Sequence, residues 1–192
     1  PIFVDCTASY DLPNRYLDIL EAGMHIATPN KRANSMSMDF YHELRKTANR
    51  MHRRFLYETN VGAGLPIIDT LQNLFKSGDK LTGFYGIMSG SLSYIFGRLD
   101  EGVSFSRAVI EAREKRYTEP DPRDDLAGLD VARKALIIAR EAGISLELED
   151  ITMHNVFPEG FDSTGTIEEF LNKLPQVDDY FSKKVSDLKK QG

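Results

Sequence analysis

Apolar positions in the N-terminal part of the chain alternate between strand-like runs and helical stripes. Short runs of β-prone residues predict strands at Ile2–Val4, in the segment HIATPN (25–30) and at Phe55–Tyr57. Between them, apolar residues at helical spacing predict a helix from Asn14 to Ala22 and a longer one from Ser37 to Met51. Because strands that alternate with helices usually pair in parallel, this part of the chain indicates an α/β start.

Beyond residue 57 the pattern becomes less regular and more helical. Helices are predicted at Ile67–Lys76, from Ser91 or Ser93 to Leu99, at Phe105–Lys115, at Gly128–Ala142, and at Ile167–Lys190 with a break at Pro175. Two β-prone stretches, Leu81–Met88 and LELEDITMHNVFP (146–158), predict extended strands. Strands of this kind at the edge of a sheet tend to pair across a two-fold axis, so we predict a homodimer or a higher homo-oligomer.

The composition is that of a globular protein. The chain has 192 residues, 41% apolar and 28% charged, with a net charge of −5, which favours neither nucleic acid nor a membrane as a partner. Its one cysteine, Cys6, excludes an internal disulfide and lies in a strand-like run, so it is interpreted as a small buried core residue. With no signal peptide or membrane-spanning run, we expect a cytoplasmic protein.

Acidic residues crowd into the segment YTEPDPRDDLAGLDVARKALIIAREAG, residues 117–143. Four of them, Glu119, Asp121, Asp124 and Asp125, lie upstream of a predicted helix on which Asp130 and Lys134 share a face. The spacing fits a surface ion pair and a helix cap from Asp124 or Asp125. The crowding of like charges favours a site instead, in which carboxylates bind an ammonium group and the lysine supplies a proton to a substrate oxygen. That chemistry suits a small, amino-acid-like substrate.

A second candidate is the glycine-rich loop ETNVGAGLP, residues 58–66. Its Gly62 and Gly64 do not form the G-x-G-x-x-G fingerprint of dinucleotide-binding loops, because no third glycine follows at the required place. Such a loop can present carbonyls to a hard cation or amides to an anion, and it can equally be a tight turn. The residues themselves leave these interpretations open.

Four motifs stand in the order and spacing of one family: TPNKRA (28–33), ETNVGAGLPII (58–68), GIMSGSLSYI (86–95) and the acidic segment 117–143. The chain resembles homoserine dehydrogenase over nearly its whole length, and most closely the dehydrogenase portion of bifunctional aspartokinase/homoserine dehydrogenase. The resemblance implies NAD- or NADP-dependent interconversion of L-aspartate 4-semialdehyde and L-homoserine, on the route to threonine and methionine. The fold it implies is α/β: residues 1–57 form part of a Rossmann-like nucleotide-binding domain, and residues 58–192 form an α+β catalytic and dimerisation domain with a mixed sheet covered by helices.

The resemblance also assigns roles to individual residues. It implies that Lys134 donates the proton and that Lys31 lies at the junction of cofactor and substrate. It implies that homoserine is bound by Glu119 and Asp130, in a pocket that Ser91 and Asp125 also line. Thr7 is implied to contact the nicotinamide half of NAD or NADP. A monovalent cation such as Na⁺ is implied to bind main-chain carbonyls of the glycine-rich loop, those of Glu58, Val61, Ala63 and Leu65.

The sequence also departs from the family. The strand and glycine-rich phosphate loop that open the family's nucleotide-binding domain, and its C-terminal return to that domain, are missing from these residues, so we expect a piece of a longer chain with half a cofactor site. Two rival interpretations remain, a non-catalytic dimerisation module and a related amino-acid semialdehyde dehydrogenase. Convergence of Lys31, Lys134 and Glu119 in one cleft would favour the enzyme.

Overall fold

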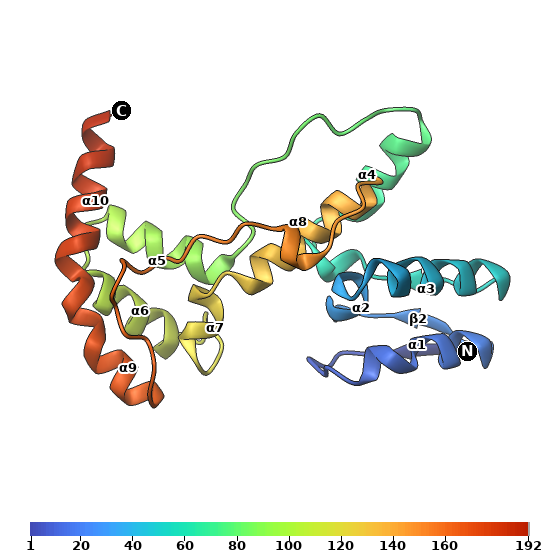
Figure 1. Ribbon diagram of the computed structural model, residues 1–192, viewed down its shortest axis with the longest axis horizontal. Coiled ribbons are helices and arrows are strands. Elements are labelled where there is room, and N and C mark those ends of the chain that lie inside the picture. The colour runs from blue at the N-terminus through green and yellow to red at the C-terminus, as the bar shows by residue number, and fades with distance from the viewer. Residues whose placement is uncertain (192) are drawn as a thin grey trace. The chain divides into compact units, whose positions relative to one another are not determined.

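The computed structural model describes residues 1–191, which fall into two compact units (Figure 1). Unit 1 combines Pro1–Met88 with Val131–Thr152, and unit 2 combines Ser89–Asp130 with the described residues from Met153 onward. Each unit is therefore assembled from two separate stretches of the chain.

Unit 1 contains the strands and the first helices. Its elements are β1 (Ile2–Val4), η1 (Leu12–Arg15), α1 (Tyr16–Glu21), β2 (His25–Ala27), α2 (Arg32–Ser35), α3 (Met38–Arg50), β3 (Phe55–Leu56), η2 (Glu58–Asn60), α4 (Ile67–Lys76) and η3 (Leu148–Asp150). Helix α8 (Leu129–Glu141) belongs to this unit from Val131 onward.

The sheet of unit 1 has three parallel strands in the order β1-β2-β3. Phe3 pairs with Ile26, and Ile26 with Phe55, so the three side chains lie on one face of the sheet. Helices α1 and α3 cover this face, and Ile26 is buried in the same apolar cluster as Tyr16 and Leu44. The predicted α/β class and the three predicted N-terminal strands are thereby confirmed.

The opposite face of the sheet is open. Ile2, Val4 and Leu56 expose 66%, 60% and 50% of their surface, respectively. Alternation along β1 therefore separates a covered face from an uncovered one. Cys6, two residues beyond β1, is also exposed, so the prediction that it is a buried core residue is wrong. Continuing the alternation of β1 places Cys6 on the same uncovered side as Ile2 and Val4, whereas the buried position falls to Asp5.

All regular elements among the described residues of unit 2 are helices, and residues 153–166 are irregular. Its elements are α5 (Gly90–Asp100), α6 (Phe105–Glu114), α7 (Pro122–Leu126), α9 (Ile167–Lys173), η4 (Leu174–Val177) and α10 (Asp178–Gln191), together with the first residues of α8. Phe105, Phe170 and Phe181 lie in one buried cluster, in which the rings of Phe105 and Phe181 stack at 3.9 Å between centroids. The side chain of Ser89 begins α5 by accepting from the amide of Leu92.

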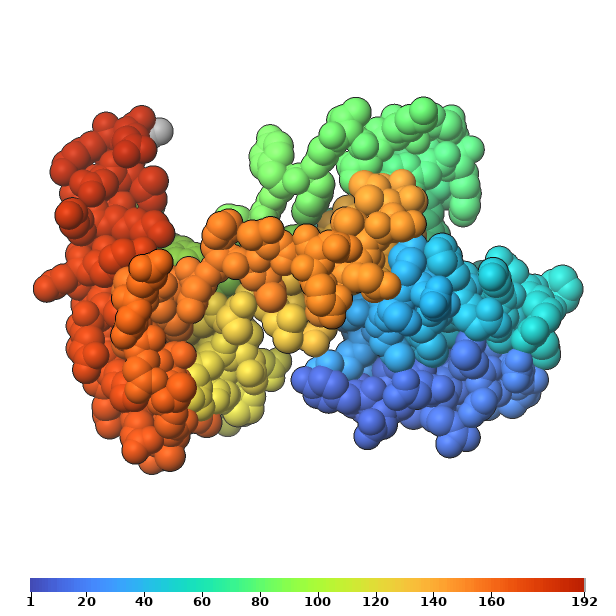
Figure 2. Space-filling view, viewed as in Figure 1, coloured from blue at the N-terminus to red at the C-terminus, as the bar shows by residue number. Residues whose placement is uncertain are grey.

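The two predicted strands beyond residue 57 are absent from the described residues. Leu81–Met88 contains no helix or strand and runs as an extended loop from α4, and Figure 2 shows its side chains projecting from unit 1. The stretch at 146–158 contains one 3₁₀ turn, η3, and otherwise irregular backbone. A strand is stable only when it pairs, and neither stretch has a neighbouring strand within residues 1–191, so the predicted mixed sheet does not form there.

Candidate active site

A buried polar network lies where β1 and β2 of the parallel sheet end. Asp5 follows β1 and exposes 1% of its surface. Its Oδ1 accepts the amide and the hydroxyl of Thr7, at 2.8 and 2.7 Å. Its Oδ2 accepts the hydroxyl of Tyr16 and the Nδ2 amide of Asn30, the latter at 3.2 Å. The carboxyl ends of parallel strands are where α/β proteins bind their ligands, so the network lies in a functional position.

The hydrogen bonds of this network stabilise the ionised form of the Asp5 carboxyl group. Burial alone would raise the pKa of its carboxyl group, but the hydrogen bonds from Tyr16, Thr7 and Asn30 outweigh burial and lower that pKa below its ordinary value. Burial and the neighbouring Asp5 raise the pKa of Tyr16 well above its usual range, so Tyr16 remains a donor.

The predicted cofactor residues Thr7 and Lys31 both adjoin this network. Thr7 bonds to Asp5 directly. Lys31 follows Asn30 in the chain and is the N-cap residue of α2, where it is half-buried. Asp5 therefore links the loop after β1 to the turn that carries Lys31. The sequence analysis missed Asp5, although an acidic residue at the end of an apolar run was a signal for it.

The predicted proton donor, Lys134, lies in the second turn of α8. Its Nζ donates to the main-chain carbonyl of Met88 at 2.6 Å. Asp130 lies in the first turn of the same helix, four residues earlier, as the spacing predicted. Lys134 is half-buried, and its amine is directed to the end of the loop that leads into the SGS motif.

In unit 2, Asp125 joins two of the predicted substrate-binding residues. Its Oδ1 accepts the hydroxyl of Ser91 at 2.6 Å, and its Oδ2 accepts the main-chain amide of Glu119 at 2.8 Å. Ser91 also shares a hydrogen bond of 2.9 Å with Ser89, the cap of α5. Ser91, Glu119 and Asp125 therefore lie together, as expected for residues of one site.

Asp121, another acid of the segment, has a structural role. Asp121 caps α7, a helix that the sequence analysis missed, and forms an ion pair with Arg123 at 2.6 Å. That guanidinium lowers the pKa of Asp121 below its ordinary value. Arg123 also donates to the carbonyls of Ser163 and Gly165. The crowding of like charges is thus partly relieved by one arginine that belongs to the same segment.

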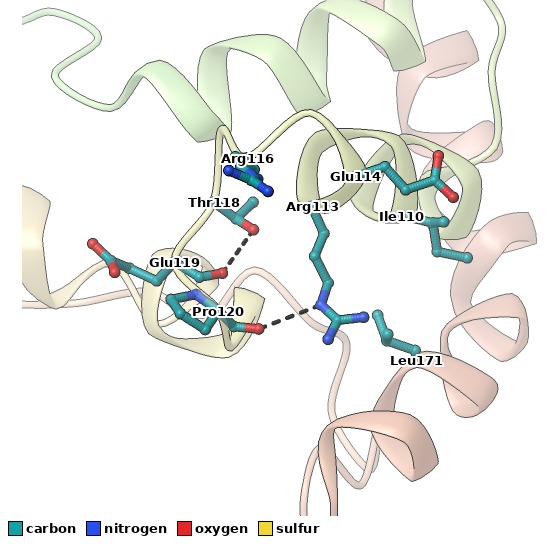
Figure 3. A pocket seen from close by; sticks show the side chains of 8 residues that line it. All are labelled: Ile110, Arg113, Glu114, Arg116, Thr118, Glu119, Pro120 and Leu171. Atoms are coloured by element: carbon teal, nitrogen blue, oxygen red, sulfur yellow. Dashed lines mark hydrogen bonds between the residues drawn. The ribbon is translucent and has the colours of Figure 1, made fainter.

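A pocket of about 570 Å³ lies beside Glu119 (Figure 3). Arg113 and Arg116 supply its basic groups, Arg113 donates to the carbonyl of Pro120 at 3.3 Å, and Leu171 contributes apolar surface. The carboxylate of Glu119 extends away from Arg113 in this view. Glu119 is exposed, so its carboxylate is accessible to a small ligand on the side that faces away from Arg113.

The glycine-rich loop, residues 58–66, is the predicted cation site. The carboxylate of Glu58 is engaged with α4, where it accepts the amides of Ile68 and Asp69, each at 2.8 Å. Gly62 and Ala63 both adopt positive φ, 83° and 51°. No cluster of His, Cys, Asp and Glu side chains that could hold a metal ion occurs within residues 1–191. A cation bound here would therefore depend on main-chain carbonyls, the donor type preferred by hard cations.

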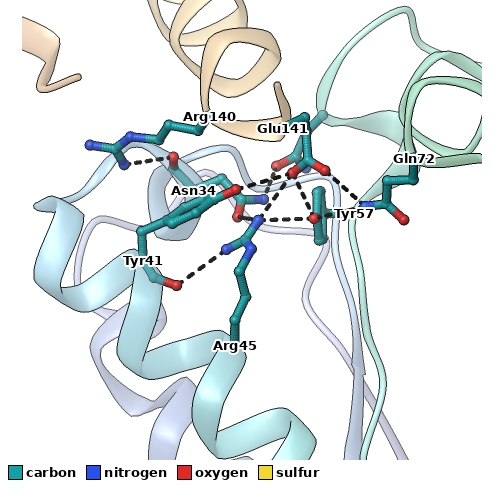
Figure 4. Close-up of polar contacts among 8 residues, drawn as sticks. Asn34, Tyr41, Arg45, Tyr57, Gln72, Arg140 and Glu141 are labelled. Atoms are coloured by element: carbon teal, nitrogen blue, oxygen red, sulfur yellow. Dashed lines mark hydrogen bonds and ion pairs between the residues drawn. The ribbon is translucent and has the colours of Figure 1, made fainter. Parts of the chain in front are cut away.

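A buried ion pair holds α8 against the other elements of unit 1 (Figure 4). Arg45 Nη2 lies 3.1 Å from Glu141 Oε1, and the Glu141 side chain is 5% exposed. Tyr57 donates to the same oxygen at 2.7 Å, and Gln72 donates to the other at 2.8 Å. Burial raises the pKa of Tyr57 well above its usual range, which keeps its hydroxyl protonated. The sequence analysis missed this cluster.

The chain shows similarity to known proteins along its full length. Residues 66–191 match the family described as homoserine dehydrogenase, and residues 1–58 match the family described as homoserine dehydrogenase, NAD binding domain. A bifunctional aspartokinase/homoserine dehydrogenase of Haemophilus influenzae is 53% identical over 192 residues, which are 100% of this chain and 24% of that protein.

Solved structures agree with these matches. A Candida auris protein of unknown function shares 41% identity with a TM-score of 0.88, over 97% of this chain and 54% of that one. A hyperthermophilic archaeal homoserine dehydrogenase in complex with NADPH shares 26% identity with a TM-score of 0.68, over 79% of this chain and 48% of that one. The chain thus spans about a quarter of the bifunctional relative and about half of these two structures.

The parallel sheet of unit 1, with its polar side chains gathered after the strands, defines an α/β protein of the nucleotide-binding class. The family matches take the assignment further, and the chain belongs to the homoserine dehydrogenase family. They also support the predicted nicotinamide cofactor. The predicted domain boundary at residues 57 and 58, and the convergence of Lys31, Lys134 and Glu119 in one cleft, stay predictions. No helix within residues 1–191 is long and apolar enough to cross a membrane.

Proposed function

We propose that this chain carries the substrate-binding and proton-donating residues of a homoserine dehydrogenase, which interconverts L-aspartate 4-semialdehyde and L-homoserine in the synthesis of threonine and methionine. The observation that carries the proposal is the position of Asp125, whose carboxylate bridges Ser91 and the main chain of Glu119. Three residues from two family motifs, residues 86–95 and 117–143, are thereby held in one place, within a chain that matches the family over residues 1–58 and 66–191.

The reaction places distinct demands on these residues. When bound, the nicotinamide cofactor supplies or accepts the hydride at the substrate carbon. As negative charge grows on the aldehyde oxygen, Lys134 stabilises it and donates the proton. Asp130, one helical turn earlier, orients Lys134 and also binds homoserine. Glu119 binds the substrate ammonium, and Lys31 neutralises its carboxylate or positions its carbonyl.

The nicotinamide half of NAD or NADP is held by Thr7 and Lys31. The polar network of Asp5 fits this role, because it fixes the loop and the turn that carry these two residues at the end of the sheet. A relative in the same family was solved with NADPH, which favours NADP as the cofactor.

A monovalent cation such as Na⁺ would be held in the glycine-rich loop by the main-chain carbonyls of Glu58, Val61, Ala63 and Leu65. The positive φ angles of Gly62 and Ala63 support this proposal, because the carbonyl groups of the loop then do not follow the directions of a regular helix or strand. The Leu65 carbonyl also accepts the amide of Ile67 at 2.9 Å, and a carbonyl oxygen has a second lone pair for the cation.

The protein is a homodimer or a higher homo-oligomer in which Leu81–Met88 pairs with a second copy. Within this segment, Tyr85 and Ile87 expose 98% and 81% of their surface. An extended apolar segment with unpaired backbone is a template for strand pairing. The proposed location is the cytoplasm, a prediction made from the sequence.

A substrate panel on the full-length protein tests the proposed activity. Oxidation of NADPH and NADH is followed with aspartate semialdehyde, succinate semialdehyde and glutamate semialdehyde. We expect turnover of aspartate semialdehyde to exceed that of the others by at least a hundredfold, because a site built to bind a specific ammonium and carboxylate rejects analogues that lack or displace them. Equal turnover of all three would favour a related semialdehyde dehydrogenase, and no turnover would favour the non-catalytic dimerisation module.

A further inference from the structure

The proton of the Thr7 hydroxyl is already used in a hydrogen bond to Asp5. Thr7 Oγ1 donates to Asp5 Oδ1 at 2.7 Å, and the amide of Thr7 donates to the same oxygen at 2.8 Å. An ionised carboxylate has no hydrogen to give, so Asp5 is the acceptor in both bonds. Because hydrogen bonds from Tyr16 and Asn30 also lower the pKa of Asp5, the carboxylate stays ionised at neutral pH.

The rest of the Thr7 hydroxyl is partly used as well. The amide of Ser9 donates to Thr7 Oγ1 at 3.1 Å. A hydroxyl has one hydrogen and two acceptor lone pairs. Within residues 1–191, the hydrogen bonds to this oxygen are those with Asp5 and Ser9, which leave one lone pair. Thr7 is exposed, so this lone pair is available to a ligand, and it can only accept.

That polarity limits which part of the cofactor the hydroxyl can meet. Phosphate oxygens and the carboxamide carbonyl are acceptors, and they find no donor at Thr7 Oγ1. The amide nitrogen of the nicotinamide carboxamide carries two N–H donors. We propose that Thr7 recognises nicotinamide as a hydrogen-bond acceptor for this N–H group, and that Asp5 is the positioning residue that fixes the polarity. The proposal rests on the proposed function, in which Thr7 contacts the nicotinamide half.

The Asp5 carboxylate also positions the turn that carries Lys31, the second proposed cofactor residue. Asn30 Nδ2 donates to Asp5 Oδ2 at 3.2 Å and to the carbonyl of Ser9 at 3.0 Å. Asn30 immediately precedes Lys31. Asp5 therefore ties the acceptor at Thr7 to the turn that bears the lysine. One buried carboxylate orients both sides of the nicotinamide subsite.

The test compares the natural cofactor with its 3-acetylpyridine analogue, in which an acetyl group replaces the carboxamide and the N–H donors are lost. Calorimetry on the full-length protein measures the affinity of both for wild type, for Thr7→Val and for the control Thr7→Ser, which keeps the hydroxyl. We expect Thr7→Val to weaken the natural cofactor about fivefold to tenfold, the effect of one neutral hydrogen bond. The analogue should bind wild type and Thr7→Val within about twofold of each other, and Thr7→Ser should resemble wild type with both ligands.

The outcomes separate the inference from the function on which it rests. Equal losses with both ligands would overturn the inference and show that the hydroxyl meets another group, such as a ribose hydroxyl. No loss with either ligand would show that Thr7 does not contact the cofactor, which would overturn that part of the proposed function.

A second variant tests the role of Asp5. In Asp5→Ala, the Thr7 hydroxyl loses its acceptor, so its proton can turn toward the ligand. We expect discrimination between the natural cofactor and the analogue to fall toward unity, and a cooperative thermal melt shows that the variant is folded. Undiminished discrimination in a folded Asp5→Ala variant would overturn the positioning role.

Discussion

Lys134 donates a hydrogen bond from Nζ to the main-chain carbonyl of Met88, at 2.6 Å, across 46 residues of sequence. Met88 immediately precedes Ser89, whose side chain caps α5. The amine of the proposed proton donor is therefore held by main chain at the entrance to the SGS motif. A main-chain carbonyl accepts a hydrogen bond from the ammonium group and so fixes its direction.

The first prediction concerns this lysine. In the full-length protein, Lys134→Ala should lower kcat by about a hundredfold to ten-thousandfold, the usual contribution of a positioned acid or base, and should raise KM by less. The reason is that its interaction strengthens as the oxyanion forms. Lys183→Ala, which removes an exposed lysine of α10, is the control and should leave both constants unchanged. A wild-type kcat for Lys134→Ala would exclude the assignment.

The second prediction separates two adjacent acids. Asp125 bonds to Ser91 and to Glu119, whereas its neighbour Asp124 is exposed. Asp125→Ala should raise KM for homoserine about tenfold or more, because two charge-assisted hydrogen bonds that hold the pocket are lost. Asp124→Ala should change KM by less than about twofold. Steady-state kinetics in the direction of homoserine oxidation measure both, and equal effects of the two variants would contradict the proposed pocket.

The third prediction addresses the buried ion pair of unit 1. Glu141→Ala should lower the free energy of unfolding by about 3–5 kcal/mol, because Arg45 is left partly buried without its partner. Glu149→Ala, an exposed glutamate in η3 of the same unit, should change it by less than about 0.5 kcal/mol. Urea unfolding followed by circular dichroism gives both values. Similar losses in the two variants would show that the cluster contributes no special stability.

The fourth prediction is a pH dependence. The pKa of Asp5 is lowered in the folded protein, so its stabilising contribution is fully present above the unfolded pKa of about 3.9 and is lost as pH falls toward the folded pKa. Asp5→Asn should therefore be less stable than wild type at pH 7, and the difference should shrink as pH falls below about 4. Urea midpoints across this range measure it. A difference that stays constant with pH would show that the charge of Asp5 contributes nothing.

The fifth prediction tests the proposed dimer. Ile87→Lys places a charge in the exposed segment Leu81–Met88 and should shift the protein to monomers, because burying an unpaired ammonium in an interface is unfavourable. Leu188→Lys is the control, since Leu188 of α10 is also exposed, at 59%. Light scattering at micromolar concentration reads the mass of each. A monomeric wild type, or a dimeric Ile87→Lys variant, would argue against pairing through this segment.

The spacing of apolar residues predicted an element correctly where the signals for that element lie within its own sequence. The apolar stripe from Ile67 onward and the stop at Gly78 predicted α4 with the bounds that the structure shows. Helix α7 was missed because its five residues carry no helical period, and it begins instead at the side chain of Asp121 and at Pro122. The strands expected at 81–88 and 146–158 failed for a related reason, since pairing partners lie outside any local window.

The candidate site likewise contains residues that the sequence predicted and contacts that it could not predict. Family motifs predicted Ser91, Glu119 and Asp125, and the structure brings these three together. The cluster of Arg45 and Glu141 joins residues 96 positions apart, and the spacing of residues along the chain cannot predict such a contact. The hydrogen bond from Asn30 to Asp5, 25 positions away, likewise depends on two strand ends meeting at one edge of a parallel sheet.

The interleaving of the two units has a consequence for synthesis on the ribosome. Unit 1 needs Val131–Thr152 to complete its core, yet all of Ser89–Asp130 is translated before that stretch. The sheet therefore leaves the exit tunnel before Ile137 and Ile138 can close the cluster around Tyr57. Unit 2 must in turn wait for the residues after Met153. Vectorial folding, one finished domain after another, is not open to this chain, and nascent intermediates with exposed apolar surface are expected to engage chaperones.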